Sequence, residues 1–204
     1  KELAQLWRNL LIKIYSKNNY DLMVQCIRIK AFLVTIQALP MATKQTPYNP
    51  IDNKVEDHIR KILEGDFQQA ALGTVDNKGY PMVTKIVPML HIEVIYLLLS
   101  DLSEHTKNLY QNEMASIYFA EKESHKIKSN NPRLTLQGTL QKLNFKKNEP
   151  QFQGLLKQYN KIEPGAKMWA MFADFNFYSF KQERMLFVEG FGKAYESTSE
   201  EVSK

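Results

Sequence analysis

The sequence predicts a mainly β (α+β) fold in which an antiparallel barrel is flanked by helices. Two observations carry this prediction. Seven short apolar or alternating segments follow one another with tight turns between them, and two helical excursions interrupt the series. Strands joined in this way fold most readily into a closed or nearly closed barrel, because closure removes exposed strand edges.

The first half of the predicted domain begins with a helix. Apolar residues at helical spacing predict this helix over 51–63, and Gly65 ends it. Strands are expected over 67–75, 80–90 and 91–99, with a hairpin turn at 76–79 between the first two. A short amphipathic pattern around residues 102–110 predicts a second helix, and a strand over 115–120 follows.

The second half opens with a polar loop over 121–131. Strict alternation then predicts a strand over 133–143, with Leu134, Leu136, Gly138 and Leu140 on one face. A helix over 149–159 and two last strands over 172–180 and 184–195 complete the order. The stretch 165–171 can border a cleft, but we expect Trp169 to pack in the core.

Composition and charge narrow the function classes. The chain of 204 residues has a formal net charge of +5, but six basic and only two acidic residues lie within residues 1–40. The remainder is nearly neutral, so we expect no nucleic-acid partner for the main domain. Cys26 is the only cysteine, which excludes an internal disulfide and a cysteine-based zinc site. A reducing, cytoplasmic location fits this cysteine usage.

Residues 1–50 differ from the rest and predict an extension or leader outside the core fold. Its first forty residues are apolar and basic, but no apolar run reaches the ~20 residues that a membrane span needs, so no stable membrane insertion is expected. Residues 31–42 are also compatible with a secretory signal core, and the segment with a surface-lying amphipathic helix. A start at Met41, with the preceding residues translated from upstream, is the simpler interpretation. The expected domain spans 51–196, and 197–204 form a polar tail.

A cluster of polar residues follows the predicted strand 91–99. Hydroxyls, basic groups and backbone N–H groups at a helix start are what a phosphate needs, whereas ordinary helix capping requires no ligand. The cluster consists of Ser100, Ser103, His105, Thr106, Lys107 and Asn108. No catalytic motif, catalytic residue or metal site can be assigned from the sequence. Of the four histidines, only His105 lies within a motif; His58 is expected to be solvated.

Several ordered motifs together resemble one known family. They are AALGTVDNKGYPMVTKIVP, LLLSDLSEHTKNLYQNEMASIYF, RLTLQGTLQKL, FADFNFYSF and VEGFGKAYE. This order resembles the FMN-binding split-barrel proteins related to pyridoxamine 5'-phosphate oxidase, over about residues 52–196. The pattern Ser100-x-Leu102-x-x-His105-Thr106-x-Asn108-Leu109 and the late Gly190-Phe191-Gly192-x-Ala194 are most similar to the haem-utilisation branch.

The resemblance implies a homodimer of split barrels with FMN, a small-molecule cofactor, in clefts at the dimer interface. The phosphate would lie on the segment from Ser100 to Asn108, and the strands containing Lys85 and Arg133 would line the rest of the flavin. The implied cofactor-binding residues are Lys85, Ser100, Ser103, His105, Thr106, Lys107, Asn108 and Arg133. The implied activity is that of a flavin-dependent oxidoreductase.

Two departures from the family pattern leave alternatives open. The chain lacks the Trp- and Arg-bearing final segment of the true oxidases, so oxidation of pyridoxamine phosphate is not expected. Haem-degrading members have a histidine ligand near the last motif, whereas no histidine follows His125, and Tyr195 is expected to be a surface-strand residue. Haem binding on the same fold, or a barrel without a cofactor, remains the alternative.

Overall fold

The structure, a computed structural model, describes residues 47–198. Of the extension predicted over residues 1–50, residues 1–46 lie outside the described residues, as do residues 199–204 of the predicted tail. The contact with the barrel begins before the predicted boundary at residue 51, since the Asn49 N–H donates to the Ala194 carbonyl at 2.7 Å. The end of the domain also extends further than expected, because Ser197 and Thr198 belong to the last strand.

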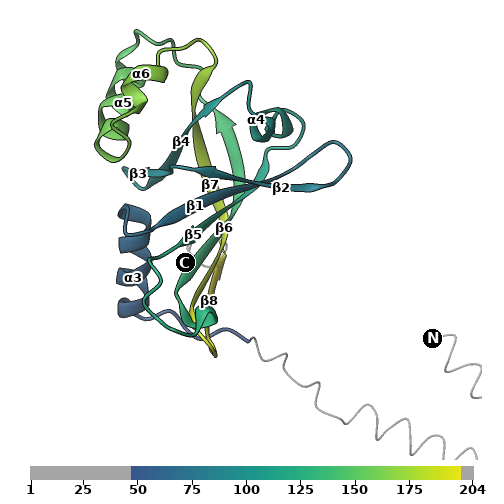
Figure 1. The fold of residues 1–204 in the computed structure, drawn as a ribbon, viewed down its shortest axis with the longest axis vertical. Coiled ribbons are helices and arrows are strands. Elements are labelled where there is room, and N and C mark those ends of the chain that lie inside the picture. The colour runs from purple at the N-terminus through teal and green to yellow at the C-terminus, as the bar shows by residue number, and fades with distance from the viewer. Residues whose placement is uncertain (1–46, 199–204) are drawn as a thin grey trace, which may run out of the picture. The chain divides into compact units, whose positions relative to one another are not determined.

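The fold is a strongly curled antiparallel sheet with helices packed around it (Figure 1). Along the main path the strand order is β2-β1-β5-β6-β7-β4-β3, and β8 pairs with β7. The strands are β1 (Gln69–Val75), β2 (Pro81–Ile86), β3 (Met89–His91), β4 (Val94–Ser100), β5 (Met114–Ala120), β6 (Arg133–Lys142), β7 (Phe175–Gly190) and β8 (Lys193–Thr198). The helices are α3 (Asn53–Glu64), α4 (Glu104–Leu109), η1 (Lys128–Asn130), α5 (Pro150–Ile162) and α6 (Ala166–Trp169).

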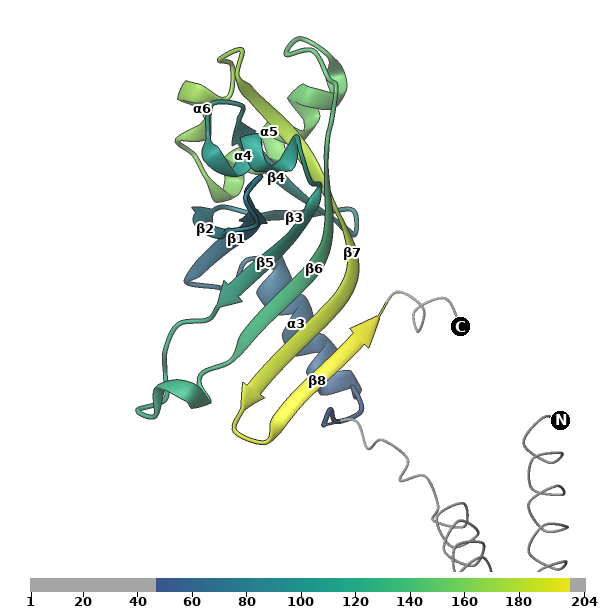
Figure 2. The same ribbon diagram turned by 90° about the vertical axis from the view of Figure 1, so that its right-hand side faces the viewer.

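Strand β7 joins the two parts of the sheet. One edge pairs with β6 over nearly its whole length. The other edge pairs with β4 over residues 175–180 and with β8 over residues 184–190. Figure 2 shows β5, β6, β7 and β8 lying side by side, with β4 at the other end of β7. The predicted antiparallel split barrel is confirmed by this arrangement.

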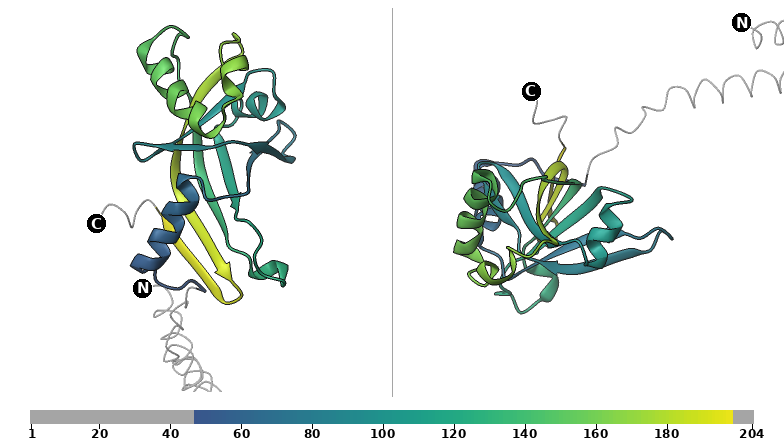
Figure 3. Two further views of the ribbon diagram at one scale, coloured as in Figure 1. Left: turned by 60° about the vertical axis from the view of Figure 1, so that its left-hand side comes forward. Right: turned by 90° about the horizontal axis from the view of Figure 1, so that it is seen from above.

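The core consists of two apolar clusters that share β4 and β7. The first contains Leu97 and Tyr178 and is covered by α3 through Val55, Ile59 and Ile62. The second contains Leu98 and Phe177 and is covered by α5 through Phe152 and Tyr159. Successive residues of both strands are therefore buried on opposite faces, which explains why the sequence there reads as continuous apolar runs. Figure 1 shows α5 above β3 and α3 below it, so the two helices overlap on one side of the strands in the view from above (Figure 3).

The expected helices are present, with a small addition. Helix α3 begins after Asp52, whose carboxylate accepts the Val55 N–H at 3.0 Å, and ends at Gly65 with φ 125°. A left-handed φ of this kind favours glycine, as the sequence predicted. Helix α5 extends to Ile162, three residues beyond the predicted end. The four-residue helix α6 was not predicted.

Eight strands are present where the sequence predicted seven, because the predicted strand 80–90 is interrupted at residues 87–88 and forms β2 and most of β3. The predicted strand 91–99 is β4, but it begins only at Val94, after a tight turn at Ile92 and Glu93, both with positive φ. Residues 181–183 were expected to separate two strands, yet β7 continues through them. The chain reverses instead at Gly192, with φ 76°, since that is where a left-handed residue is available.

Gly138 gives a direct test of this sheet. It lies at the register shift between β6 and β7, and a Cβ there would lie 2.0 Å from the Lys181 carbonyl oxygen. We expect Gly138→Ala to lower the free energy of unfolding by about 3 kcal/mol, because the backbone of β7 must move. Exposed Gly154 in α5 has no heavy atom within 4 Å of its ideal Cβ. The control Gly154→Ala should stabilise by about 0.8 kcal/mol in the same urea titration. Equal stability of the two variants would contradict the observed pairing.

Candidate functional site

A pocket of about 310 Å³ lies between two walls of different character. The first wall comes from β2, β4 and the start of α4 and carries Lys85, Ser100, Ser103 and His105. The second wall comes from α5, α6 and the start of β7 and carries Tyr159, Glu163, Trp169 and Phe175. Four of the eight residues implied by the family resemblance thus meet in one cavity.

His105 is the most distinctive residue of the first wall. Its Nδ1 lies 3.0 Å from the Thr84 hydroxyl of β2, which orients the ring. Its Nε2 is buried and has no hydrogen-bond partner among residues 47–198. Burial lowers the pKa of the imidazole, so the ring is neutral at pH 7. A neutral imidazole with one nitrogen open can donate to, or accept from, a bound ligand.

Ser100 and Ser103 also present oxygens to the pocket. Ser103 is the N-cap residue of α4, but its side chain makes no capping hydrogen bond. The Ser100 hydroxyl donates to Asp174 Oδ2 at 2.5 Å and accepts the Leu102 N–H at 3.1 Å. The Ser103 hydroxyl therefore makes no capping bond, whereas the Ser100 hydroxyl is already hydrogen-bonded to Asp174 and to the Leu102 N–H.

Thr106, Lys107 and Asn108 do not line this pocket. The Asn108 amide is buried and donates to the Thr74 hydroxyl at 3.0 Å, which fixes α4 to β1. Thr106 is fully buried, and its hydroxyl has no partner among the described residues. Lys107 is exposed and pairs with Glu104 at 2.5 Å.

Arg133 lies far from the pocket within the same chain. It is the first residue of β6, and its guanidinium donates to the Ser129 carbonyl at 2.8 Å. Lys142, the last residue of β6, bonds to Asp101 beside Ser100. A ten-residue strand is about 30 Å long, so Arg133 and Lys142 lie at opposite ends of β6. Figure 2 shows the full length of this strand.

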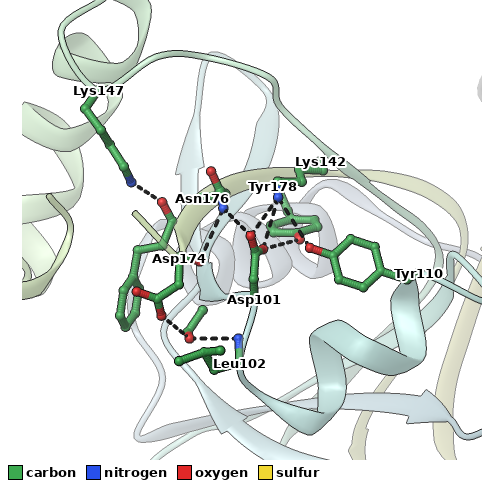
Figure 4. Close-up of polar contacts among 10 residues, drawn as sticks. Asp101, Leu102, Tyr110, Lys142, Lys147, Asp174, Asn176 and Tyr178 are labelled. Atoms are coloured by element: carbon green, nitrogen blue, oxygen red, sulfur yellow. Dashed lines mark hydrogen bonds and ion pairs between the residues drawn. The ribbon is translucent and has the colours of Figure 1, made fainter. Parts of the chain in front are cut away.

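A polar network behind the pocket anchors the connection between β4 and α4 to β7 (Figure 4). The Asp101 carboxylate accepts hydrogen bonds from Lys142 at 2.8 Å and from Asn176 at 2.9 Å. The Asp101 N–H donates to the Asp174 carbonyl at 2.7 Å. Burial by itself would raise the pKa of the Asp101 carboxyl, but hydrogen bonds from Lys142 and Tyr110 hold that pKa below its usual value. The network fixes the segment that carries Ser100 and Ser103.

Sequence reasoning missed Asp174 and the contribution of α5, and it gave a position beside a cleft for residues 165–171 only as the alternative to a core role. Asp174 lies 74 residues from Ser100, so no local pattern could connect the two. Trp169 packs against Phe175 with ring centroids 4.7 Å apart, as its expected core role requires, but it also lines the pocket. The apolar and aromatic composition of residues 168–172 was the available signal.

Two further sequence expectations differ from the structure. His58 is only 28% exposed and contacts Glu121 at 2.5 Å, so it is not simply solvated. Tyr195 is buried and stacks on Phe187 with centroids 5.9 Å apart, so the expected surface position was wrong. Among residues 47–198, no three His, Cys, Asp or Glu side chains converge as metal ligands.

A second and larger cavity, of about 550 Å³, lies beside α3. Its floor is apolar, with Ile59, Ile95 and Phe180, and the Arg60–Glu93 ion pair lies at its edge. None of the eight implied cofactor-binding residues lines it. The smaller cavity is therefore the candidate site, because its polar groups converge.

Comparison with protein families gives a match to the CREG, beta-barrel model over residues 66–203, which is more than half of the chain. The chain belongs to the CREG beta-barrel family. No curated protein sequence matches it. None of the helices in the described part of this family member is long and apolar enough to cross a membrane.

Solved structures share the fold at low sequence identity. ChuZ from Campylobacter jejuni is 23% identical with a TM-score of 0.64, and the match covers 84% of this chain and 69% of ChuZ. A heme binding protein from Mycobacterium smegmatis is 21% identical with a TM-score of 0.60, covering 69% of this chain and 56% of that protein. A Clostridium acetobutylicum protein related to general stress protein 26, of the pyridoxinephosphate oxidase family, is 17% identical with a TM-score of 0.56. That match covers 74% of this chain and 99% of the stress protein.

The Asp101 network predicts a pH-dependent contribution to stability. We expect Asp101→Asn to lower the free energy of unfolding by about 1 kcal/mol at pH 7, because Lys142 loses its anionic partner. Since folding lowers the pKa of Asp101, its contribution is present above a pH of about 4 and is lost as the pH falls further.

Urea unfolding of the wild type and Asp101→Asn at pH 7 and pH 3 measures this difference. The exposed pair Glu104–Lys107 supplies the control, because Glu104→Gln should change stability by less than about 0.5 kcal/mol. A difference between the wild type and Asp101→Asn that is as large at pH 3 as at pH 7 would show that the carboxylate charge is not what stabilises the network.

Proposed function

We propose that this chain binds FMN in the pocket between β2, β4 and α4, and that it acts as a flavin-dependent oxidoreductase. The observation that carries the proposal is the meeting of Lys85, Ser100, Ser103 and His105 around one cavity, together with a buried His105 nitrogen that has no hydrogen-bond partner among the described residues. The same four residues belong to the motifs that resemble a flavin-binding family.

The residues of the first wall fit a phosphate group. A phosphate presents acceptor oxygens only, apart from any bound proton, and needs hydrogen-bond donors and positive charge. Lys85 supplies charge, the Ser103 hydroxyl makes no capping bond, and neutral His105 can donate from Nε2. No carboxylate lines this wall, because Glu163 belongs to the opposite wall and Asp174, which accepts the Ser100 hydroxyl, does not line the pocket.

The outer face of the sheet supports a homodimer with the site beside its interface. Val83 is 71% exposed, Met114 63% and Tyr118 40%, although all three belong to strands. Lys85 is paired with Ala71, which is paired with Tyr118, so this pocket residue lies on the same sheet face as the exposed apolar side chains. A second copy is the occupant that we assign to this face.

The dimer also accounts for Arg133. It lies on the same outer face as Tyr118, because Thr135, two residues along β6, is paired with Tyr118. A twofold axis brings one end of this face against the opposite end in the second copy. We therefore assign Arg133 to the pocket of the neighbouring subunit rather than to that of its own. A cavity of about 310 Å³ is at the lower limit for small-molecule sites, consistent with completion by a second copy.

When bound, FMN would supply hydride or single-electron transfer. The residues of this chain would bind and orient it: Ser103, His105 and Lys85 hold its anionic end. No residue of the described chain is assigned a proton-transfer role.

Haem is the second candidate ligand. The M. smegmatis protein with the same fold is a heme binding protein, and the open Nε2 of His105 is of the type that ligates haem iron. Tyr195 is not proposed as a ligand, because its ring is enclosed against Phe187. Haemin binding with a Soret band that depends on His105, in the absence of FMN binding, would favour this candidate over the first.

Titration of the full chain with FMN, followed by flavin fluorescence, tests the proposal. We expect saturable binding of one FMN per chain, and a dissociation constant about tenfold larger for Lys85→Ala, which corresponds to about 1.4 kcal/mol. Lys78 lies in the turn of the same hairpin and is exposed, so Lys78→Ala is the charge-matched control and should bind FMN like the wild type. No FMN binding by the wild type, or equal effects of the two substitutions, would contradict the proposed site.

A further inference from the structure

The second wall of the candidate pocket is aromatic and comes from a part of the chain that the first wall does not use. Trp169 ends α6, and Phe175 begins β7. Their rings pack at 4.7 Å with an angle of 44° between the planes, and both residues line the pocket. Trp169 is only partly buried, so part of its ring remains available to a ligand.

The two walls of the pocket carry side chains of opposite charge. Lys85, Ser103 and His105 lie on the first wall, whereas Glu163 lies on the wall with Trp169. The Tyr159 hydroxyl on that second wall is already used, because it donates to the Val87 carbonyl at 2.8 Å. An anionic group is therefore favoured at the first wall and repelled at the second, which leaves the aromatic side to an uncharged part of the ligand.

The aromatic wall is held rigidly by Lys147 and by small buried residues. The Lys147 ammonium donates to the Ala170 carbonyl at 2.8 Å and to the Phe175 carbonyl, and lies 4.4 Å from the centre of the Phe152 ring. Ala166, the first residue of α6, and Ala170, which follows its last residue, are fully buried. The segment that carries Trp169 is thus tied at both ends, so a ligand need not order it on binding.

We propose that Trp169, supported by Phe175, is the surface against which the planar ring of the ligand stacks. The ligand class is a planar conjugated ring with an anionic tail, the tail lying at Lys85 and Ser103. This inference rests on the proposed function and adds the ring-binding part of the same site. FMN and haem share this chemistry, so the two are separate arms of the test.

Riboflavin and FMN distinguish the two walls, since riboflavin has the same ring but no phosphate. We expect Trp169→Ala to weaken both ligands by the same factor, about tenfold, because aromatic stacking is lost. Trp169→Phe should restore most of the affinity. Ser103→Ala should weaken FMN but not riboflavin, and so change the ratio of the two dissociation constants. If Trp169 only supported the fold, we would not expect Trp169→Ala to keep the ratio of the two dissociation constants. We would also not expect Trp169→Phe to restore binding.

Phe172 supplies the matched control. It is 59% exposed, lies three residues after Trp169 and does not line the pocket, so Phe172→Ala should bind both flavins like the wild type. Dissociation constants are measured by flavin fluorescence with the full chain, and by Soret absorbance for haemin.

Each outcome decides between the two claims. Wild-type FMN binding that Trp169→Ala leaves unchanged would overturn the aromatic wall and retain the proposed FMN site. Haemin binding without FMN binding, weakened by Trp169→Ala, would support the wall and overturn FMN as the ligand. Binding of neither FMN nor haemin by the wild type would overturn both claims.

Discussion

The candidate site depends on the anchoring of the β4–α4 connection to β7. Asp174 accepts the Ser100 hydroxyl at 2.5 Å, and its backbone carbonyl accepts the Asp101 N–H at 2.7 Å. Asp101 in turn bonds to Lys142 of β6 and Asn176 of β7. The connection is thereby fixed to two neighbouring strands, which gives Ser103 and His105 defined positions beside β2. These bonds hold the start of α4, a helix of only six residues, while the hydrogen bond from Asn108 to Thr74 fixes its later part to β1.

Much of the fold could be predicted because its signals are local. The alternation of β6 and the Gly65 cap of α3 each depend on a few adjacent residues. The continuity of β7 through 181–183 could not be predicted in this way, because pairing with β6 on one edge overrides a polar stretch that looks like a turn. The residues of the candidate site also divide into those with a local sequence signal and those without one. Ser100 to His105 form a readable motif, whereas Asp174 and Trp169 come to it only through the packing of β7 and α6.

The two walls of the pocket differ in their chemistry. One wall offers hydrogen-bond donors and a positive charge, and the other offers aromatic surface and a carboxylate. Proteins of this fold include a heme binding protein and a member of the pyridoxinephosphate oxidase family, and we propose flavin first and haem second as the ligand of this chain. The proposed ligands differ in how they would use His105. Its Nε2, which has no hydrogen-bond partner among the described residues, can donate to the phosphate of a flavin or ligate the iron of a haem.

Visible absorption spectra after gel filtration test the central claim most directly. The full chain is incubated with FMN or, separately, with haemin, and passed through the column to remove free ligand. The account predicts that flavin bands remain with the wild type in about equimolar amount and are lost from His105→Ala combined with Lys85→Ala. Flavin that elutes free of the wild-type protein, with or without a retained haem Soret band, would contradict the claim.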